Sequence, residues 1–211
     1  MKLHWSPRSP FVRKVMIVAH EKSLLDQIEL VRSPVAMTQP NATLMRDNPL
    51  SKLPTLVLSD GTCLYDSHVI CEYFDVVGTG PALIPDAREP RFAALRREAL
   101  GDGILDMLVL WRAELGRAEA HRQTSLLDAF LEKRERALDA LEQEAPALEA
   151  TPFSLGHVAL VCALEYLEYR FAEQPWRSGR PKLAGWVQAV HQRPSVLSTV
   201  PRESDVPDMG R

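Results

Sequence analysis

Short apolar runs separated by turn residues mark the first part of the chain as a mixture of strands and helices. Residues 55–58 are β-branched and apolar, Asp60-Gly61 is a strong hairpin turn, and residues 62–65 supply a second strand. Asp66 and Ser67 then stand where a helix begins, because either side chain can accept an unpaired backbone N–H of the first turn. The pattern predicts a strand, a hairpin turn, a second strand and a helix in close succession.

Beyond residue 88 the strand pattern disappears and apolar residues recur at helical spacing. Gly101, Gly103 and Gly116 weaken the first helix of this part, and each could bend it or let another segment pack closely. The charged residues 132–136 in the second helix are most simply a solvated face. The spacing predicts four helices, at residues 89 to about 120, 125–144, 154–171 and 182–191.

Glycines and prolines gather between these two patterns. Gly78-Thr79-Gly80-Pro81 and Pro85-Asp86 are typical of a linker. A chain of 211 residues is long enough for one large domain or two small ones. We therefore expect a first domain at residues 1–77, a linker at 78–88 and a helical domain at 89–211, with a poorly ordered tail from residue 201.

Composition narrows the class of protein without identifying its chemistry. Hydrophobic residues make up 45% and charged ones 25%, as in ordinary globular proteins, and a formal net charge of −3 offers no general attraction for nucleic acid. No apolar run approaches the roughly 20 residues of a membrane span, and no signal-peptide core follows Met1, so we expect a cytoplasmic protein. Three cysteines without C-x-x-C spacing and six histidines without metal-ligand spacing argue against disulfides and a metal site.

Two features around the hairpin suit an anionic, peptide-like ligand. The helix start at Asp66-Ser67 combines free backbone N–H groups with the positive end of the helix dipole, which favours a carboxylate. If the Leu53-Pro54 bond is cis, the Leu53 backbone N–H and C=O turn outward and can pair with a ligand as an added strand. From the residues alone, a trans proline at a strand start is the simpler interpretation of Pro54.

Several motifs together resemble the thioredoxin-like domain of cytosolic glutathione S-transferases. They are the N-P-x-x-K-x-P turn at residues 48–54, the hairpin, and the D-S-x-x-I-x-E-Y helix start at residues 66–73. The strand at residues 2–5, the S-P-F-V-R-K helix start at 9–14 and the strand at 27–31 resemble the first half of that domain, most closely in bacterial serine-type members. The resemblance implies an α/β thioredoxin-like N-terminal domain followed by an all-helical C-terminal domain.

In that family the proline equivalent to Pro54 is cis, and the pair equivalent to Asp66 and Ser67 holds the γ-glutamyl end of glutathione. The resemblance therefore implies glutathione as a co-substrate. It further implies a cytoplasmic homodimer that acts in detoxification. The glutathione contacts that it implies are Phe11, Lys52, Leu53, Pro54, Asp66 and Ser67.

The chemistry of such a site is stabilisation of a thiolate. A thiol with a pKa of about 8.5 is mostly protonated at neutral pH, and only the thiolate is a strong nucleophile. Ser9 precedes Pro10, a favoured first helical residue, so the residues alone assign Ser9 to helix capping. The resemblance makes Ser9 the catalytic residue whose hydroxyl faces the glutathione sulfur, with Ser6 in the same loop as the alternative.

Other polar residues near these motifs could either contact the ligand or have a structural role. Lys52 could pair with a glutathione carboxylate or remain an exposed loop lysine. Arg13 could add positive potential near the sulfur or make a surface or interface pair. His68 could touch the ligand or a partner subunit, although an exposed histidine is simpler, and His4 is expected to be a plain strand residue.

The resemblance also implies a second substrate, a small electrophile that enters against the helical domain. Met107, Leu108 and Trp111 could form a wall of that pocket or belong to the core. The leading function is a glutathione transferase that conjugates an electrophile or reduces a peroxide. A glutathione-dependent isomerase or dehalogenase, and a non-catalytic binding or regulatory module, remain open, but the intact Ser9 and Asp66-Ser67 favour an enzyme.

Two residues depart from the family pattern. Ser51 stands where glycine is common, so the turn must accept a Cβ there. Residues 151–158 resemble the family's capping box and hydrophobic staple, with Ser154 as the cap, but His157 replaces the usual aspartate. Because a carboxylate suits the positive end of the helix dipole, we expect His157→Asp to raise stability by about 0.5 to 2 kcal/mol.

Overall fold

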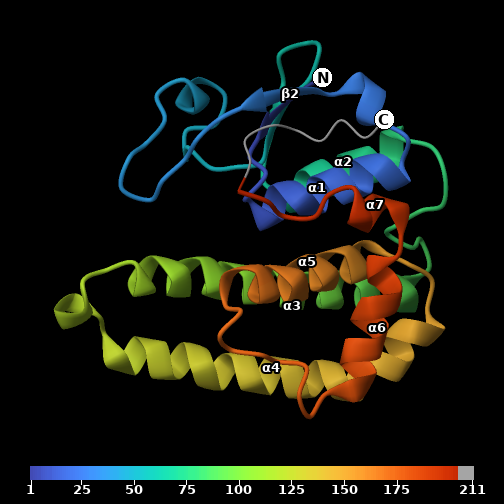
Figure 1. Cartoon of the computed structure of the whole chain (residues 1–211). Helices are drawn as coiled ribbons and strands as arrows, with labels where there is room; N and C mark the ends of the chain where they lie inside the picture. Colours follow the sequence, from blue (N-terminus) through green and yellow to red (C-terminus); the bar gives the residue numbers. More distant parts are fainter. Residues whose placement is uncertain (204–211) are drawn as a thin grey trace. The chain divides into compact units, whose positions relative to one another are not determined.

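The computed structural model of the chain describes residues 1–203, and it divides into two compact units (Figure 1). Unit 1 comprises Met1–Asp86 together with the chain from Pro194, and unit 2 comprises Ala87–Arg193. Residues 204–211, which hold most of the tail that we expected to be poorly ordered, lie outside the described residues.

A four-stranded mixed sheet forms the centre of unit 1, in the order β2-β1-β3-β4. Its strands are β1 (Lys2–Trp5), β2 (Glu29–Arg32), β3 (Thr55–Val57) and β4 (Cys63–Leu64). β2 is parallel to β1, while β3 is antiparallel to both β1 and β4. The Asp60-Gly61 turn closes the β3–β4 hairpin as predicted, with Gly61 at φ 88° and the Asp60 carboxylate accepting the Thr62 N–H.

Side chains alternate between the two faces of this sheet, and each face has its own character. Leu3 and Leu56 lie opposite each other in the register and are fully buried on one face. His4 and Thr55, the next pair along, are polar and buried on the other face. The sheet therefore has one apolar face for helix packing and a second face with buried polar groups.

Helices α1 (Pro10–Glu21) and α2 (Ser67–Val77) lie side by side against the sheet (Figure 1). Val18 of α1 and Phe74 of α2 are fully buried, as expected for the inner faces of amphipathic helices. The short helix α7 (Pro194–Leu197) packs on α1, where its Val196 carbonyl accepts a hydrogen bond from Arg13 and its Ser195 hydroxyl bonds Glu21. Two 3₁₀ turns, η1 (Leu25–Gln27) and η2 (Leu44–Arg46), complete unit 1.

A buried ion pair fixes the start of the linker to unit 1. Lys22 Nζ lies 3.1 Å from Asp75 Oδ1 and donates to the carbonyl oxygens of Gly80 and Pro81. The Asp75 carboxylate also accepts the backbone N–H groups of Leu83 and Ile84. Because each charge is paired and hydrogen-bonded, its burial is compensated, and the linker is held at both ends of residues 80–84.

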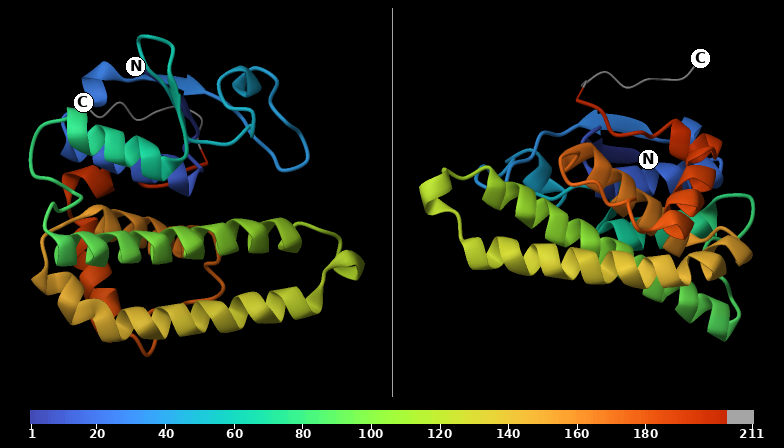
Figure 2. Two further views of the ribbon diagram at one scale, coloured as in Figure 1. Left: turned by 180° about the vertical axis from the view of Figure 1, so that it is seen from behind. Right: turned by 60° about the horizontal axis from the view of Figure 1, so that its bottom comes forward.

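Unit 2 is all-helical, which together with the sheet unit confirms the predicted fold class (Figure 2). It contains α3 (Arg88–Leu115), η3 (Glu119–His121), α4 (Thr124–Ala150), α5 (Leu155–Arg170) and α6 (Pro181–His191). α3 packs most extensively on α5, and α4 packs on α3 and α6. The four predicted helices are present, although α3 ends at its cap Gly116, before the residue 120 that we expected.

Two glycines allow α3 and α5 to approach closely. A Cβ on Gly101 would lie 2.6 Å from the backbone carbon of Ala159, and a Cβ on Gly156 would lie 2.6 Å from the Ala94 carbonyl oxygen. Gly103, two residues after Gly101, has nothing within 4 Å of its Cβ position. We expected each α3 glycine to bend the helix or to let another segment pack closely. For Gly101 the structure shows close packing.

Our prediction for the end of the second helix was wrong. We expected it to end at residue 144, before Pro146, but α4 continues through this proline to Ala150. Ala145 and Leu148, on either side of the proline, are both buried. Packing of this last stretch overrides the cost of one missing backbone hydrogen bond.

His157 rebuilds the capping box at the start of α5. Its Nδ1 accepts the Ser154 backbone N–H at 3.1 Å, while its Nε2 lies 3.0 Å from the Leu148 carbonyl oxygen and donates to it. The ring packs between Phe153 and Trp186, at centroid distances of 5.7 and 5.9 Å. A carboxylate at this position would remove the His157 donor and leave the Leu148 carbonyl only the longer bond from the Thr151 hydroxyl, so the stabilisation that we expected from His157→Asp becomes a loss.

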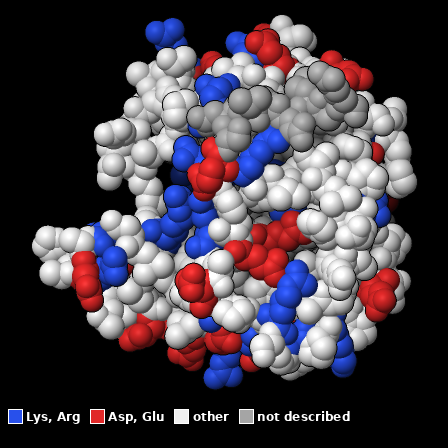
Figure 3. All heavy atoms as spheres, in the orientation of Figure 1, with Lys and Arg blue, Asp and Glu red and all other residues white. Residues whose placement is uncertain are grey.

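Charges on unit 2 are mixed, and several of them pair. Basic and acidic side chains lie interspersed over the helical unit on the face that Figure 3 shows. Arg180 bonds Glu135 and Asp139 of α4, and Arg97 bonds Glu144 at 2.8 Å. Within residues 1–203, no helix is both long and apolar enough to cross a membrane.

Candidate functional site

The strand register brings three of the predicted site segments to one end of the sheet. Because β1 and β3 are antiparallel, with His4 opposite Thr55, the chain that leaves β1 lies beside the chain that enters β3. Leu64 lies opposite Leu56, so the chain that leaves β4 reaches the same end. The α1 start, the turn before β3 and the α2 start therefore meet there.

At the start of α1, Ser9 is the N-cap. It has an extended backbone, with φ −85° and ψ 119°, and its Oγ accepts the Val12 N–H at 3.3 Å. Accepting this bond occupies one lone pair of the hydroxyl, so the O–H can still donate to a ligand. Ser6 is buried, and its carbonyl accepts the Ser9 N–H at 3.2 Å.

The turn before β3 carries the expected cis bond between Leu53 and Pro54. Ser51 has φ 52°, the left-handed region that glycine prefers, which explains why glycine is common at this place in the family pattern. The Ser51 hydroxyl accepts the Asn41 N–H at 2.8 Å, and the Lys52 side chain is exposed. The structure thus keeps the turn despite the added Cβ.

At the start of α2, Asp66 is the N-cap and Ser67 is the first helical residue. Asp66 is exposed, and its Oδ1 accepts the His68 N–H at 3.0 Å. Ser67 is buried, and His68 is half-buried. The Tyr65-Asp66 bond is also cis. A carboxylate cap beside free helix N–H groups offers both an acceptor and donors to a zwitterionic ligand group.

Two further predicted residues of unit 1 lie on the first turn of α1. Phe11 is half-buried, beside the Ser9 cap. Arg13 is buried and turned to α7, where it donates to the Val196 carbonyl at 3.3 Å. Arg13 therefore pairs inside unit 1 and not at the surface, where one of its two interpretations had placed it, and its effect on the sulfur stays a prediction.

The thiol of Cys63, in β4, is not activated for nucleophilic attack. Burial raises the pKa of the half-buried Cys63 thiol, and the nearby Asp47 carboxylate raises it further, against a smaller opposite effect of Lys2. Cys71 and Cys162 are buried. Among the described residues, no group of three or more His, Cys, Asp or Glu side chains gathers as a metal site requires.

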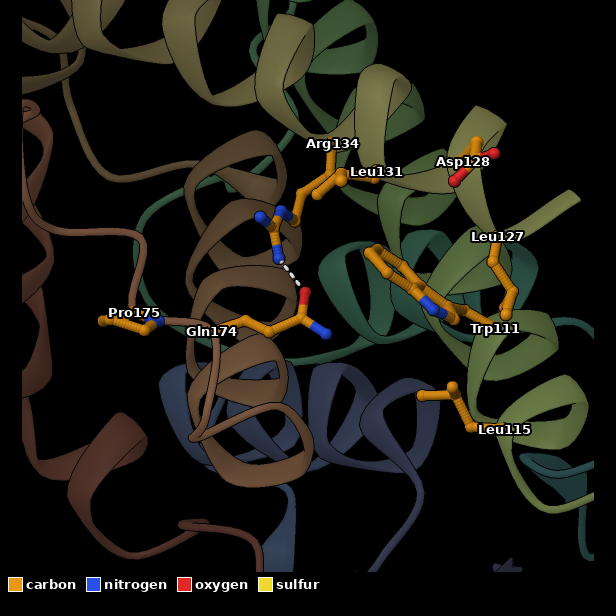
Figure 4. A pocket seen from close by; sticks show the side chains of 8 residues that line it. All are labelled: Trp111, Leu115, Leu127, Asp128, Leu131, Arg134, Gln174 and Pro175. Carbon is orange, nitrogen blue, oxygen red and sulfur yellow. Dashed lines mark hydrogen bonds between the residues drawn. The ribbon is translucent and has the colours of Figure 1, made fainter. Parts of the chain in front are cut away.

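Unit 2 has a pocket of about 450 Å³ between the end of α3, the start of α4 and the segment after α5 (Figure 4). The Arg134 guanidinium and the Gln174 amide lie on one side, and the Trp111 indole lies on the other with Leu115 and Leu127. Arg134 bonds Gln174 and lies 5.5 Å from the centre of the Trp111 ring. The pocket is thus mainly apolar, with Arg134 and Gln174 on one wall and the Asp128 carboxylate as a third polar lining group.

The predicted pocket residues of α3 differ in their surroundings. Trp111 lines this pocket, whereas Met107 and Leu108 are not part of its lining. Met107 is half-buried and Leu108 is fully buried in unit 2. Our assignment of Arg134 to a solvated face was wrong, because this side chain is buried and lines the pocket. Gln174 was missed, because a loop amide carries no local signal for a pocket.

Sequence reasoning also missed a polar cluster under the turn before β3. His4, which we took for a plain strand residue, bonds Ser33 and Asp47, and Thr55 bonds Asn48. All five residues are polar, and His4, Ser33, Asn48 and Thr55 are buried. The one available signal was a histidine between two apolar residues, Leu3 and Trp5, in a short strand.

The chain matches two domain models along its sequence. The N-terminal domain model of glutathione S-transferases matches residues 8–77, and the C-terminal domain model matches residues 123–189. The uncharacterized GST-like protein YibF of Escherichia coli (strain K12) is 33% identical over 203 residues, which are 95% of this chain and 98% of that protein.

Solved structures agree with these matches. A glutathione transferase family member from Pseudomonas fluorescens Pf-5, with bound glutathione, is 41% identical with a TM-score of 0.92, covering 95% of this chain and 98% of that one. A glutathione S-transferase from Methylobacillus flagellatus KT, with glutathione bound, is 36% identical with a TM-score of 0.85, covering 95% and 99%. By both domain models and by these relatives, the chain belongs to the glutathione S-transferase family.

Proposed function

We propose that the protein is a serine-type glutathione transferase that ionises the glutathione thiol and directs it at a small electrophile. The observation that carries this proposal is the meeting of the Ser9 cap, the cis Leu53-Pro54 turn and the Asp66-Ser67 helix start at one end of the sheet. Relatives at 41% and 36% identity have been solved with glutathione bound, which supports the same ligand here.

Ser9 is the proposed catalytic residue. Its hydroxyl accepts the Val12 N–H, which fixes the oxygen at the start of α1, and its proton donates to the glutathione sulfur. The positive end of the α1 dipole favours the same negative charge. Both effects lower the pKa of the bound thiol, so a larger fraction is thiolate at neutral pH.

The remaining contacts hold the peptide part of glutathione. The Leu53 N–H and C=O pair with its backbone as an added strand would, on the turn that Pro54 fixes. Asp66 accepts from the γ-glutamyl ammonium, while Ser67 and the first N–H groups of α2 donate to its carboxylate. Lys52 pairs with a carboxylate from the exposed turn, and Phe11 supplies apolar contact.

The electrophile is proposed to contact Trp111, with the half-buried Met107 as the other candidate on α3, while the fully buried Leu108 belongs to the core. The Trp111 pocket suits a flat apolar body with a polar group directed at Arg134 and Gln174. Addition, displacement and peroxide reduction are all reactions of the same thiolate. The homodimer, the cytoplasmic location and the role in detoxification belong to this proposal as what the family resemblance implies.

Binding to immobilised glutathione, followed by calorimetry and a screen of aryl halides and peroxides, tests the proposal. Asp66→Asn is a matched variant, because asparagine caps a helix as well as aspartate does but carries no charge. We expect wild-type retention and turnover, and weaker glutathione binding by Asp66→Asn at unchanged stability. Absence of retention and turnover would contradict the enzyme and favour a non-catalytic module.

A further inference from the structure

His4 joins three segments of unit 1 on the polar face of the sheet. It lies in β1, one of the two inner strands of the sheet, and is 3% exposed. Its Nδ1 lies 2.7 Å from Ser33 Oγ, just after β2, and its Nε2 lies 2.8 Å from Asp47 Oδ2, just after η2. One side chain therefore connects β1 to the end of β2 and to the loop that leads into the turn before β3.

Thr55, which lies opposite His4 in β3, holds the next residue of the same loop. Its Oγ1 accepts from Asn48 Nδ2 at 2.9 Å and donates to the Lys52 carbonyl at the same distance. Asn48 Oδ1 in turn accepts the Leu50 N–H at 3.0 Å. His4 and Thr55, which lie opposite each other in the sheet, thus each form a hydrogen bond to one of two consecutive loop residues, Asp47 and Asn48.

These contacts lie at both ends of the backbone segment that we propose to bind glutathione. The turn from Asn48 to Pro54 begins at the residues held by His4 and Thr55 and ends at Thr55 itself. Both sets of contacts reach the turn from its buried side, because His4, Asn48 and Thr55 are buried and Thr55 contacts the exposed Lys52 through its backbone carbonyl. The position of the Leu53 N–H and C=O is therefore set by hydrogen bonds on the buried side of the turn.

We infer that His4 is a positioning residue of the glutathione site, acting through Asp47 on the backbone of Leu53. The inference rests on the proposed function and adds to it a residue outside the ligand contacts. When the turn is held in advance, less conformational freedom is lost on binding, so the effect lies in affinity for glutathione. It does not lie in the chemical step, which the proposal assigns to Ser9.

The geometry does not suit His4 for catalysis of its own. Serine, histidine and aspartate occur together here, but the Ser33 hydroxyl lies 3.2 Å from the Val31 carbonyl and donates to it. Ser33 is also buried, at 5% exposure, so its oxygen is not presented to a substrate. The cluster is built to hold backbone segments together.

The test compares His4→Leu and Asp47→Ala with His4→Gln, whose amide can still donate to Asp47. We expect His4→Leu and Asp47→Ala each to raise the Kd and KM for glutathione about tenfold, because each removes a hydrogen bond to a charged group. The kcat at saturating glutathione stays unchanged, and His4→Gln recovers most of the affinity. The double variant His4→Leu/Asp47→Ala binds no more weakly than either single one, since both remove the same link.

Ile104→Val in unit 2 is the matched control, because it trims a buried side chain far along the chain and should lower the melting temperature without changing the Kd. Amide hydrogen exchange gives a readout that needs no ligand: residues 48–54 should exchange faster in His4→Leu and not in the control. Asp47 is partly exposed, so Asp47→Ala should fold even if His4→Leu does not.

The outcomes separate the two proposals. If the wild type binds glutathione but His4→Leu and Asp47→Ala bind it equally well, the positioning role is wrong and the proposed function stands. If the wild type does not bind glutathione, the proposed function fails and the inference fails with it. A fall in kcat at unchanged KM would also overturn the inference.

Discussion

Two serines of unit 1 have the left-handed backbone that glycine tolerates best. Ser23 has φ 56° and ends α1, where the Leu24 N–H reaches back to the Ala19 carbonyl at 2.9 Å. Ser51 has φ 52° and lies in the turn before β3, where its hydroxyl accepts the Asn41 N–H. The left-handed conformation thus occurs at Ser23 with an exposed side chain and at Ser51 with a hydrogen-bonded one.

This contrast gives a stability prediction. Ser23→Gly should raise the free energy of unfolding by about 0.5 to 1 kcal/mol, because it removes the steric cost of a Cβ in this conformation. Ser51→Gly should gain less, since it also loses the bond to Asn41. Chemical denaturation of both variants measures the difference, and a larger gain for Ser51→Gly would show that the Asn41 contact contributes nothing.

Ser9 carries the prediction for catalysis. Ser9→Ala should lower kcat by about 10- to 100-fold, the size expected for one charge-assisted hydrogen bond, with little change in glutathione binding. Ser6→Ala is the control, because Ser6 lies in the same loop but is buried. Steady-state kinetics with a chloronitrobenzene decide between them: loss of turnover in Ser6→Ala alone would move the catalytic role to Ser6.

At the scale of elements, the α3–α5 contact depends on one glycine of α3. Gly101→Ala should lower the free energy of unfolding by about 1 to 3 kcal/mol, since the added Cβ would overlap the Ala159 backbone. Gly103→Ala should raise it by about 0.5 to 1 kcal/mol, because Gly103 is exposed in the same helix and alanine favours the helix. Urea midpoints of the two variants should move in opposite directions, and a shift in the same direction would contradict this account.

The elements differ in how far the sequence determines them. The β3–β4 hairpin and the starts of α1 and α2 follow from Asp60-Gly61, Ser9-Pro10 and Asp66, because turns and caps are local chemistry. The passage of α4 through Pro146 does not, because buried neighbours decide it. α7 was not predicted at all, since its four residues are too short for a periodic pattern.

The candidate site shows the same division between local motifs and tertiary contacts. Ser9, the cis Pro54 turn and the α2 start were found through motifs that are continuous in the chain. The link from His4 to Asp47 spans 43 residues and involves no motif, so only the register of the sheet and the path of the loop create it. Contacts of this kind cannot be predicted without the tertiary structure.

For the molecule as a whole, His157 makes stability depend on pH. Burial lowers the pKa of this imidazole below its ordinary 6.5, and the charges of Arg97 and Arg193 lower it further, against opposite effects of the Leu148 carbonyl and Glu144. The unfolded chain therefore binds a proton at a higher pH than the folded one does. The free energy of unfolding should fall as the pH drops from about 6.5 towards the lowered pKa.

His157→Asn isolates this effect from the other five histidines, because asparagine can accept the Ser154 N–H but does not titrate. Its free energy of unfolding should be lower than that of the wild type at pH 7. The difference between the two proteins should shrink as the pH is lowered. Denaturation curves at several pH values measure this, and a constant difference would show that His157 does not titrate differently in the folded state.

The return of α7 to unit 1 has a consequence for biosynthesis. Arg13 and Glu21 of α1 obtain their partners Val196 and Ser195 only from a segment made after all of unit 2. Translation proceeds from the N-terminus, so unit 2, which is continuous in the chain, can be completed on the ribosome while unit 1 still lacks α7. Unit 1 thus begins before unit 2 but is completed after it.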